Sequence, residues 1–160
     1  MIGLKNVNDE VIISYSDIIY NKNVIKKILN LKKKNEIILP VLNNWKKIWK
    51  IKNKNIYKDA ESLSFTKENY LTDIGKKIKK IKKVQGQYMG IIYLSKEKVN
   101  YVKEKFLKLR NKKIHLTKFI NYLINDGAKI KCLLINDNWY EFDDFEDMKN
   151  YKNFFNKNVN

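Results

Sequence analysis

Four short apolar runs, separated by longer stretches of helical periodicity, constrain the fold of this chain more than any other feature. The runs are rich in β-branched residues, as buried strands are, and they occupy residues 11–16, 36–42, 88–94 and 130–135. Apolar residues recur at helical spacing in residues 22–31, 96–109, 116–125 and 145–155. A polar turn between residues 61–65 and 70–74 predicts a hairpin. Strands that alternate with helices predict a layered α/β fold with a mainly parallel sheet and a hairpin insertion.

Proline and glycine mark two places where the sheet should be irregular. Pro40 lies inside the second apolar run and predicts either a sheet edge or a bulge, because proline cannot donate a ladder hydrogen bond. Gly86 and Gly90 flank polar and aromatic residues before the third run. They allow either close approach of the backbone to a ligand or a structural bulge, and the sequence does not choose between the two.

The length and composition predict one globular domain. A chain of 160 residues with 44% hydrophobic residues can bury a core of its own. No apolar run approaches the ~18 residues of a membrane span, and the first residues lack the apolar core of a secretory signal. The single cysteine, Cys132, lies in an apolar run and is expected to be a buried core residue. We therefore expect a cytoplasmic domain over residues 1–155, followed by a frayed tail at residues 156–160.

The formal net charge of +17 raises the question of nucleic-acid binding. All but one of the 34 basic residues are lysines, and Arg110 is the exception. Nucleic-acid readers usually use arginine for bidentate contacts to phosphates and bases. A basic nucleic-acid-binding protein is therefore kept only as the least favoured alternative.

A dense group of acids follows the last apolar run. Residues 141–147 hold five carboxylates, which is unusual in so basic a chain. They could bind a hard cation, or they could form the acidic first turn of the closing helix. Asp17 stands in a similar place, directly after the first apolar run.

Asp17 and Asp143 both fall at the carboxyl ends of predicted strands, where ligands gather in open α/β sheets. Each could instead be an ordinary turn residue or helix cap. Because His115 is the only histidine, a histidine-rich zinc site is excluded, and a carboxylate-bound magnesium ion is favoured. His115 itself precedes a predicted helix and is expected to be a cap or a surface residue.

The order of motifs along the chain resembles the nucleotidyltransferases of the sugar-nucleotide pyrophosphorylase superfamily. It is most similar to the cytidylyltransferases that activate phosphocholine, 2-aminoethylphosphonate and related compounds. The motifs that carry the resemblance span nearly the whole chain; they are residues 15–20, 44–50, 59–61, 74–77, 85–90, 116–117 and 139–143.

The resemblance implies a Rossmann-like three-layer fold and a set of site residues. Asp17 and Asp143 would hold a catalytic Mg²⁺, and Lys77 would contact the phosphate of the acceptor. The acceptor pocket would be lined by four further residues: Asp59, Glu61, Gln87 and Gly90. The implied reaction joins a nucleoside monophosphate, from CTP, to a small phosphorylated or phosphonate acceptor and releases pyrophosphate.

The chain departs from the family pattern in two ways. His115 stands where relatives usually have an acid before the Leu-Thr pair of the late helix. The glycine-rich loop that opens the relatives, and whose backbone N–H groups would grip a triphosphate, has no counterpart here. Residues 1–155 thus resemble the C-terminal two-thirds of the domain. We expect an incomplete nucleotide site, an exposed hydrophobic sheet edge, and either a complementing chain or oligomer, or a non-catalytic remnant or partner subunit.

Overall fold

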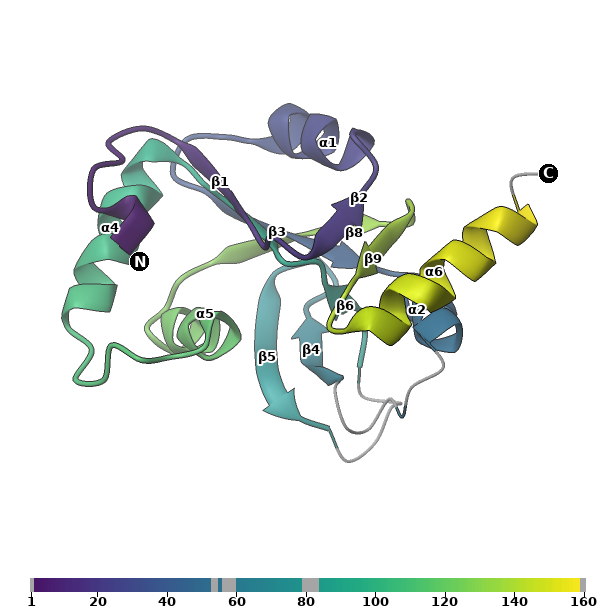
Figure 1. Ribbon diagram of the computed structural model, residues 1–160. Helices are drawn as coiled ribbons and strands as arrows, with labels where there is room; N and C mark the ends of the chain where they lie inside the picture. The colour runs from purple at the N-terminus through teal and green to yellow at the C-terminus, as the bar shows by residue number, and fades with distance from the viewer. Residues whose placement is uncertain (1, 53–54, 56–59, 79–83, 159–160) are drawn as a thin grey trace.

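The central sheet is mixed, and β3 lies at its centre (Figure 1). The computed structural model describes residues 2–52, 55, 60–78 and 84–158. Within these residues the strand order is β1 (Val11–Ser14), β7 (Ile91–Leu94), β3 (Ile37–Leu42) and β6 (Gln87–Tyr88), with β8 (Ile130–Ile135) also paired to β3. The four predicted apolar runs are therefore all strands of one sheet.

Three of the four longer strands run in the same direction. β1 and β3 are each antiparallel to β7, and β8 is parallel to β3, so β1, β3 and β8 share a direction that β7 opposes. The sequence predicted a mainly parallel sheet within an α/β fold, and the fold class is confirmed. The reversed strand, β7, leaves β3 and β8 as the hydrogen-bonded parallel pair in the described part of the chain.

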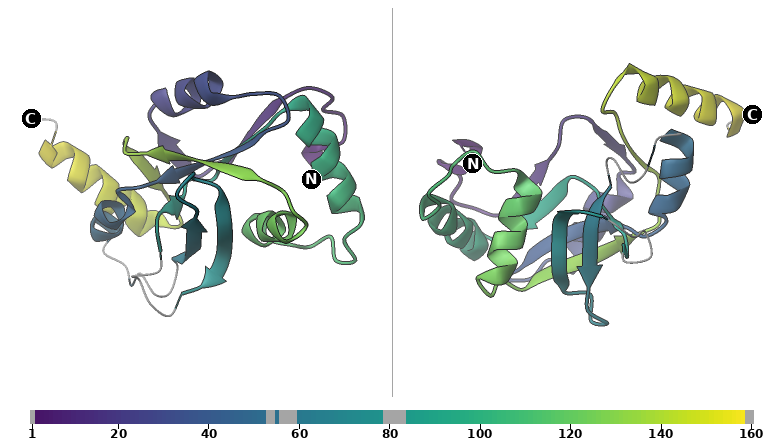
Figure 2. Two further views of the ribbon diagram at one scale, coloured as in Figure 1. Left: turned by 180° about the vertical axis from the view of Figure 1, so that it is seen from behind. Right: turned by 90° about the horizontal axis from the view of Figure 1, so that it is seen from below.

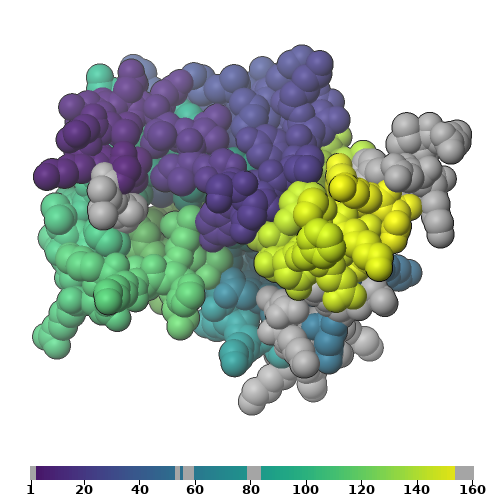
Figure 3. Space-filling view, in the orientation of Figure 1, coloured from purple at the N-terminus to yellow at the C-terminus, as the bar shows by residue number. Residues whose placement is uncertain are grey.

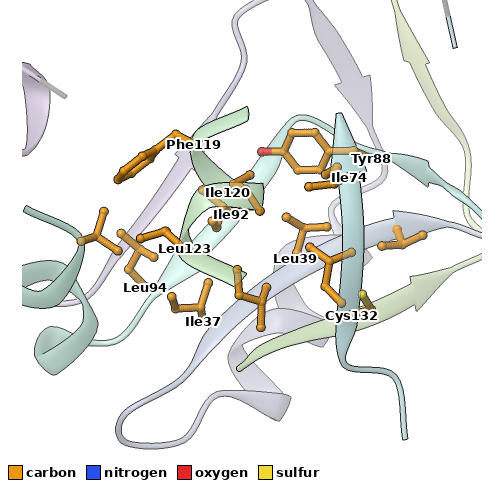
Figure 4. Packing of buried hydrophobic residues seen from close by; sticks show 14 of the residues in the cluster. Ile37, Leu39, Ile74, Tyr88, Ile92, Leu94, Phe119, Ile120, Leu123 and Cys132 are labelled. Atoms are coloured by element: carbon orange, nitrogen blue, oxygen red, sulfur yellow. The ribbon is translucent and has the colours of Figure 1, made fainter. Parts of the chain in front are cut away.

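Helices cover both faces of the sheet, which gives three layers (Figures 1 and 2). Helices α4 (Lys96–Leu107) and α5 (Leu116–Asn125) pack on one face, where residues such as Val99 and Ile120 are fully buried. Helices α1 (Asn23–Leu31) and α2 (Trp45–Lys52) pack on the other, through residues such as Ile28 and Trp45. Figure 4 shows the first of these two cores, between the sheet and α5. Cys132 belongs to it and is 2% exposed, as its apolar surroundings predict.

Smaller elements complete the fold. The predicted hairpin forms from β4 (Glu61–Phe65) and β5 (Leu71–Lys77). A two-stranded ribbon pairs β2 (Ile18–Tyr20) with β9 (Trp139–Glu141), and neither strand was predicted. A short 3-10 turn, η1 (Ile2–Leu4), opens the described chain, and helix α6 (Phe145–Asn158) closes it. The tail predicted from residue 156 is therefore helical as far as Asn158.

Pro40 lies in the middle of β3, so the prediction of a sheet edge there is wrong. The strand is paired on both sides: Pro40 lies opposite Leu133 of β8, and β7 and β6 share the other side. β7 pairs with β3 at Ile37 and Ile38, whereas β6 pairs with it at Val41 and Leu42. Pro40 therefore faces the interruption between β6 and β7, where no ladder bond requires its missing N–H.

β1 has the composition of an interior strand but lies at the edge of the sheet. Among the described residues it pairs with β7 alone, and Val11, Ile12 and Ile13 remain partly exposed. A groove of about 490 Å³ runs beside it, with mostly apolar walls from η1, β1 and the α4–α5 region. The hydrophobic edge expected from the sequence is therefore present. An apolar strand such as β1 usually has neighbouring strands on both sides, whereas β1 pairs on one side in the described structure.

Over the described residues, the helices are too short or too polar to form a transmembrane span.

Candidate active site

The junction after β1 lies beside the junction before α6. The backbone N–H of Phe142 donates to the carbonyl oxygen of Asp17 at 2.9 Å, and Ile18 pairs with Glu141 in the β2–β9 ribbon. Figure 3 shows the same relationship at the surface, where the first residues of α6 abut the N-terminal part of the chain. Asp17 and Asp143 are thereby brought to one edge of the sheet, as the sequence predicted, although the ribbon that does this was not foreseen.

A pocket of about 380 Å³ opens between this edge, the β4–β5 hairpin and the start of α5. Its walls come from six segments of the chain; the lining residues are Tyr15, Glu61, Ser62, Leu63, Ile74, Gln87, Tyr88, His115, Leu116, Thr117, Glu141 and Asp143. A volume of this size suits a small molecule. Of the predicted site residues, Glu61, Gln87 and Asp143 line the pocket, and Asp17 adjoins it through the backbone bond to Phe142.

Gly90 does not line the pocket but supports one of its walls. Its φ of +73° is a conformation that L side chains rarely adopt, and an added Cβ would lie 2.8 Å from the Tyr15 ring. The N–H of Tyr15 donates to the carbonyl oxygen of Gly90 at 2.8 Å. An added Cβ at Gly86 would lie 2.3 Å from Val41 Cγ1, so this glycine too is needed for packing. The structure thus gives both glycines a role in packing, and contact of Gly90 with an acceptor stays a prediction.

One other predicted residue, Lys77, lies apart from the lining. Lys77 ends β5 opposite Glu61, and its side chain is exposed to solvent rather than among the lining side chains. Its contact with an acceptor phosphate stays a prediction. Asp59 lies outside the described residues.

The acidic run of residues 141–147 divides between the start of α6 and the pocket, and cation binding by it stays a prediction. Asp144 Oδ1 accepts the N–H of Asp147 at 3.0 Å, and Asp147 Oδ2 accepts the N–H of Asp143 at 2.8 Å. These carboxylates satisfy backbone donors around the start of α6, where the helix dipole also favours negative charge. Glu141 and Asp143 instead face the pocket.

Lys52, which was not predicted, is the cation nearest to this site among the described ion pairs. Its side chain is 3% exposed, and its Nζ lies 2.7 Å from Asp143 Oδ2 and 3.5 Å from the fully buried Asp147. The same Nζ lies 5.7 Å from the Trp49 ring and 5.9 Å from the Tyr140 ring. A signal was present in the sequence, because Trp45, Ile48, Trp49 and Lys52 share one helical face. A lone lysine on an otherwise apolar face points to a buried partner of opposite charge.

The pKa of Glu141 is raised to about 7, chiefly by burial and also by the negative charges of Asp143, Asp17 and Asp147, against an opposing effect of Lys52. The carboxylates are therefore close enough to affect one another. Within the described residues, however, no three acid, histidine or cysteine side chains form a ready-made metal cluster.

Asp17 and Asp143 nevertheless fit a magnesium ion by the chemistry of their oxygens. Mg²⁺ commonly takes one or two carboxylates from the protein and completes its shell with water and substrate phosphates. Asp17 is exposed, and 52% of the Asp143 side chain is exposed, so both can be reached from solvent. Asp143 would have to share its carboxylate with Lys52.

Fold and site together give an α/β domain with two acids, Asp17 and Asp143, beside a pocket of small-molecule size. No protein-family model matches the chain. In sequence it is similar to the CTP:phosphoglutamine cytidylyltransferase of Campylobacter jejuni, with 29% identity over 149 residues. That match covers 88% of this chain and 58% of the relative.

Solved structures show the same fold. The inositol-1-phosphate CTP transferase from T. maritima superposes with a TM-score of 0.62 at 17% identity, over 89% of this chain and 53% of that one. HddC from Yersinia pseudotuberculosis gives a TM-score of 0.59 at 14% identity, over 95% and 59% of the two chains. The resemblance to this superfamily and to its cytidylyltransferases is thus confirmed. The chain spans a little over half the length of the proteins that it matches.

Proposed function

We propose that this chain forms the acceptor-binding and metal-binding part of a CTP-dependent nucleotidyltransferase that acts on a small phosphorylated or phosphonate acceptor. The observation that carries the proposal is the pairing of β2 with β9, which holds Asp17 and Asp143 at the rim of a pocket of about 380 Å³. The similarity to a cytidylyltransferase supports the choice of nucleotide. A cytoplasmic setting, where CTP is available, is part of the proposal.

The proposed reaction is a nucleotidyl transfer. An oxygen of the acceptor phosphate or phosphonate attacks the α-phosphorus of CTP, a new P–O bond forms, and the bond to the β-phosphate bridging oxygen breaks with release of pyrophosphate. A bound Mg²⁺ would neutralise charge on the transferring phosphate, and Asp17 and Asp143 would hold it. Lys52 fixes the Asp143 carboxylate from the protein side. Glu61 and Gln87, together with the lining tyrosines Tyr15 and Tyr88, would hold the acceptor. Lys77 would approach the phosphate of the acceptor from the end of β5.

Among the described residues, the part of the site that would bind the triphosphate is incomplete. The described residues offer no glycine-rich loop at a helix N-terminus, and the chain spans 58% of the cytidylyltransferase that it resembles. The exposed β1 edge supports a complementing chain or oligomer as part of this proposal. A non-catalytic remnant or partner subunit remains the second candidate. It is favoured by the same edge and would give a folded protein without turnover.

The proposal is tested by measuring CTP binding calorimetrically in Mg²⁺, and pyrophosphate release with CTP and an acceptor. Asp17→Asn and Asp143→Asn should each abolish saturable Mg²⁺-dependent CTP binding and any turnover. Asp9→Asn, at an exposed acid outside the pocket lining, is the matched control and should change neither. Unaltered binding and turnover in either site variant would reject the metal assignment. A folded wild-type chain that binds no CTP would support the non-catalytic alternative.

A further inference from the structure

Helix α5 begins at the wall of the pocket without a side-chain cap. His115 is its N-cap residue, with the extended backbone of such a position, and its side chain makes no cap hydrogen bond. The first helical hydrogen bond runs from the N–H of Phe119 to the carbonyl oxygen of His115 at 3.0 Å. The N–H groups of Leu116, Thr117 and Lys118 therefore have no partner within the helix. Because residues 115–117 line the pocket, the helix presents these donors to it.

An uncapped helix end of this kind favours a negatively charged oxygen. The backbone donors and the positive end of the helix dipole both attract an anion. In the family pattern an acid stands at the position of His115, and an acid there would accept from the same donors and repel an anion. The imidazole of His115 does not carry a negative charge, and it can donate a hydrogen bond of its own. The residue at the cap thus leaves the donors available to a ligand.

The other charged groups of the pocket wall do not attract an anion. Three carboxylates line the pocket, from Glu61, Glu141 and Asp143. Neither lysine nor arginine is among the described lining residues, although the chain has 34 basic residues. A negative group of a ligand is repelled by the carboxylates of β4 and β9 and attracted by the helix end. The first turn of α5 is therefore the favoured place for it.

The hydroxyl of Tyr88 is a second, independent sign of a ligand in the same pocket. Tyr88 lines the pocket and is 8% exposed, and its buried hydroxyl has no hydrogen-bond partner in the described structure. Figure 4 shows this hydroxyl on the α5 side of the ring. Burial, with the nearby Tyr15 and Glu141, raises the pKa of Tyr88 well above its ordinary value, so the side chain stays a neutral phenol that can donate. Because a buried hydroxyl is costly to leave unpaired, a ligand oxygen that accepts from it is favoured.

We infer that the first turn of α5 and the Tyr88 hydroxyl form an oxyanion subsite, in which backbone N–H groups hold a negative group of the acceptor. The inference rests on the proposed function and deepens it, because it assigns the contact of the acceptor's anion to named donors. Two groups have the required chemistry. One is the phosphate or phosphonate of the acceptor, and the other is a carboxylate elsewhere on the same molecule.

Nuclear magnetic resonance titration of the isotope-labelled chain in Mg²⁺ tests the subsite directly. One probe is 3-phosphonopropanoate, and the other is 3-phosphonopropanamide, in which a neutral amide of similar shape replaces the carboxylate. We expect the amide protons of Leu116, Thr117 and Lys118 to shift downfield and to saturate. Equal affinity for the two probes would assign the subsite to the phosphonate. Binding of the propanoate that is tighter by about fivefold or more would assign it to the carboxylate.

Three variants separate the subsite from the stability of the helix. His115→Asp supplies a cap that accepts from the same N–H groups, so it should raise the midpoint of thermal unfolding and weaken probe binding about tenfold or more. Tyr88→Phe should weaken probe binding about threefold to tenfold with the fold retained. Asn111→Asp adds the same charge at an exposed residue outside the pocket lining, and it is the control that should leave probe binding unchanged.

The absence of a saturable shift at these three amides with either probe would overturn the inference. So would wild-type affinity for both probes in His115→Asp and Tyr88→Phe. The outcome is separable from the proposed transfer reaction. Saturable binding at α5 without pyrophosphate release would uphold the subsite and reject the reaction, whereas pyrophosphate release with an unchanged kcat/KM in His115→Asp would do the reverse.

Discussion

Lys52 holds the exposed carboxylate of Asp143 at 2.7 Å while its own side chain is almost completely buried. The ammonium group also lies 3.5 Å from Asp147, whose side chain is fully buried, and the Asn150 amide donates to the Lys52 carbonyl oxygen at 3.0 Å. One residue at the end of α2 therefore fixes the turn that carries Asp143 into α6. The position of a predicted metal ligand depends on a residue that the resemblance did not assign.

Replacing Lys52 by Met should destabilise the fold by about 3 kcal/mol, because it leaves the buried Asp147 carboxylate without this cation. Lys52→Arg keeps the charge and should recover part of the loss. The free energy of unfolding from urea titrations measures both effects. Lys50→Met, at an exposed position of the same helix, is the control and should change stability by less than about 0.5 kcal/mol. Similar losses in the Lys50 and Lys52 variants would show that the buried ion pair has no special role.

Glu141→Gln should raise stability at pH 8 more than at pH 5. The folded-state pKa of Glu141 is about 7, above the ordinary value of 4.5, so the folded protein holds this proton more tightly than the unfolded chain does. The contribution of Glu141 to stability is therefore complete below about pH 4.5 and is lost as the pH rises through 7. Because glutamine does not ionise, the substitution removes this loss, which is of the order of 2 kcal/mol for a partly exposed group. Unfolding curves at the two pH values provide the comparison, and a gain that is independent of pH would contradict the predicted shift.

Gly90→Ala should destabilise the protein more than Gly127→Ala does. Both glycines have positive φ, +73° and +92°, so both substitutions strain the backbone. Only at Gly90 does the new Cβ meet another group, the Tyr15 ring at 2.8 Å, whereas nothing lies within 4 Å at Gly127. We expect a loss of about 1 kcal/mol at Gly127 and a further 1–2 kcal/mol at Gly90. Equal losses in thermal or urea unfolding would mean that Tyr15 moves aside without cost.

Cys132 should not react with thiol reagents in the folded protein. Burial raises the pKa of its thiol to about 12, so the reactive thiolate is scarce at pH 8, and the side chain is 2% exposed. Absorbance assays with an aromatic disulfide at pH 8 should show no reaction without denaturant and one equivalent in urea. Rapid labelling of the native protein would show that β8 opens readily from the sheet.

Local sequence patterns were sufficient for most elements of the fold. The apolar runs at residues 36–42 and 130–135 became strands β3 and β8, and the helical periodicity of residues 116–125 became α5 with the predicted bounds, because these signals depend only on near neighbours. For Pro40 the sequence left a sheet edge or a bulge open. The choice depended on β6 and β7, which come about 50 residues later in the chain and leave an irregular break opposite Pro40.

Several residues of the candidate site were predicted from the sequence, and the tertiary contacts added others. The motifs of the resemblance singled out Asp17, Asp143, Glu61 and Gln87. In the structure Asp143, Glu61 and Gln87 line the pocket, and Asp17 lies at its rim. His115 was expected to be a cap or surface residue, and it is the exposed N-cap residue of α5, without a side-chain cap bond. It also lines the pocket, which was not predicted. The position of His115 at the pocket follows from the packing of α5 against β5. Packing between distant segments cannot be predicted from the residues next to His115 in the sequence.

The sequence by itself therefore determined the fold class, the strands and helices of the core, the burial of Cys132 and the presence of two acids at strand ends. Each of these follows from side-chain chemistry read over a few neighbouring residues. Only the tertiary structure decided that Lys52 secures Asp143, that a β2–β9 ribbon brings Asp17 beside it, and that the pocket of a basic protein is lined by acids and tyrosines. Those relationships join residues far apart in the chain, and they form only when sheet pairing and helix packing bring the segments together.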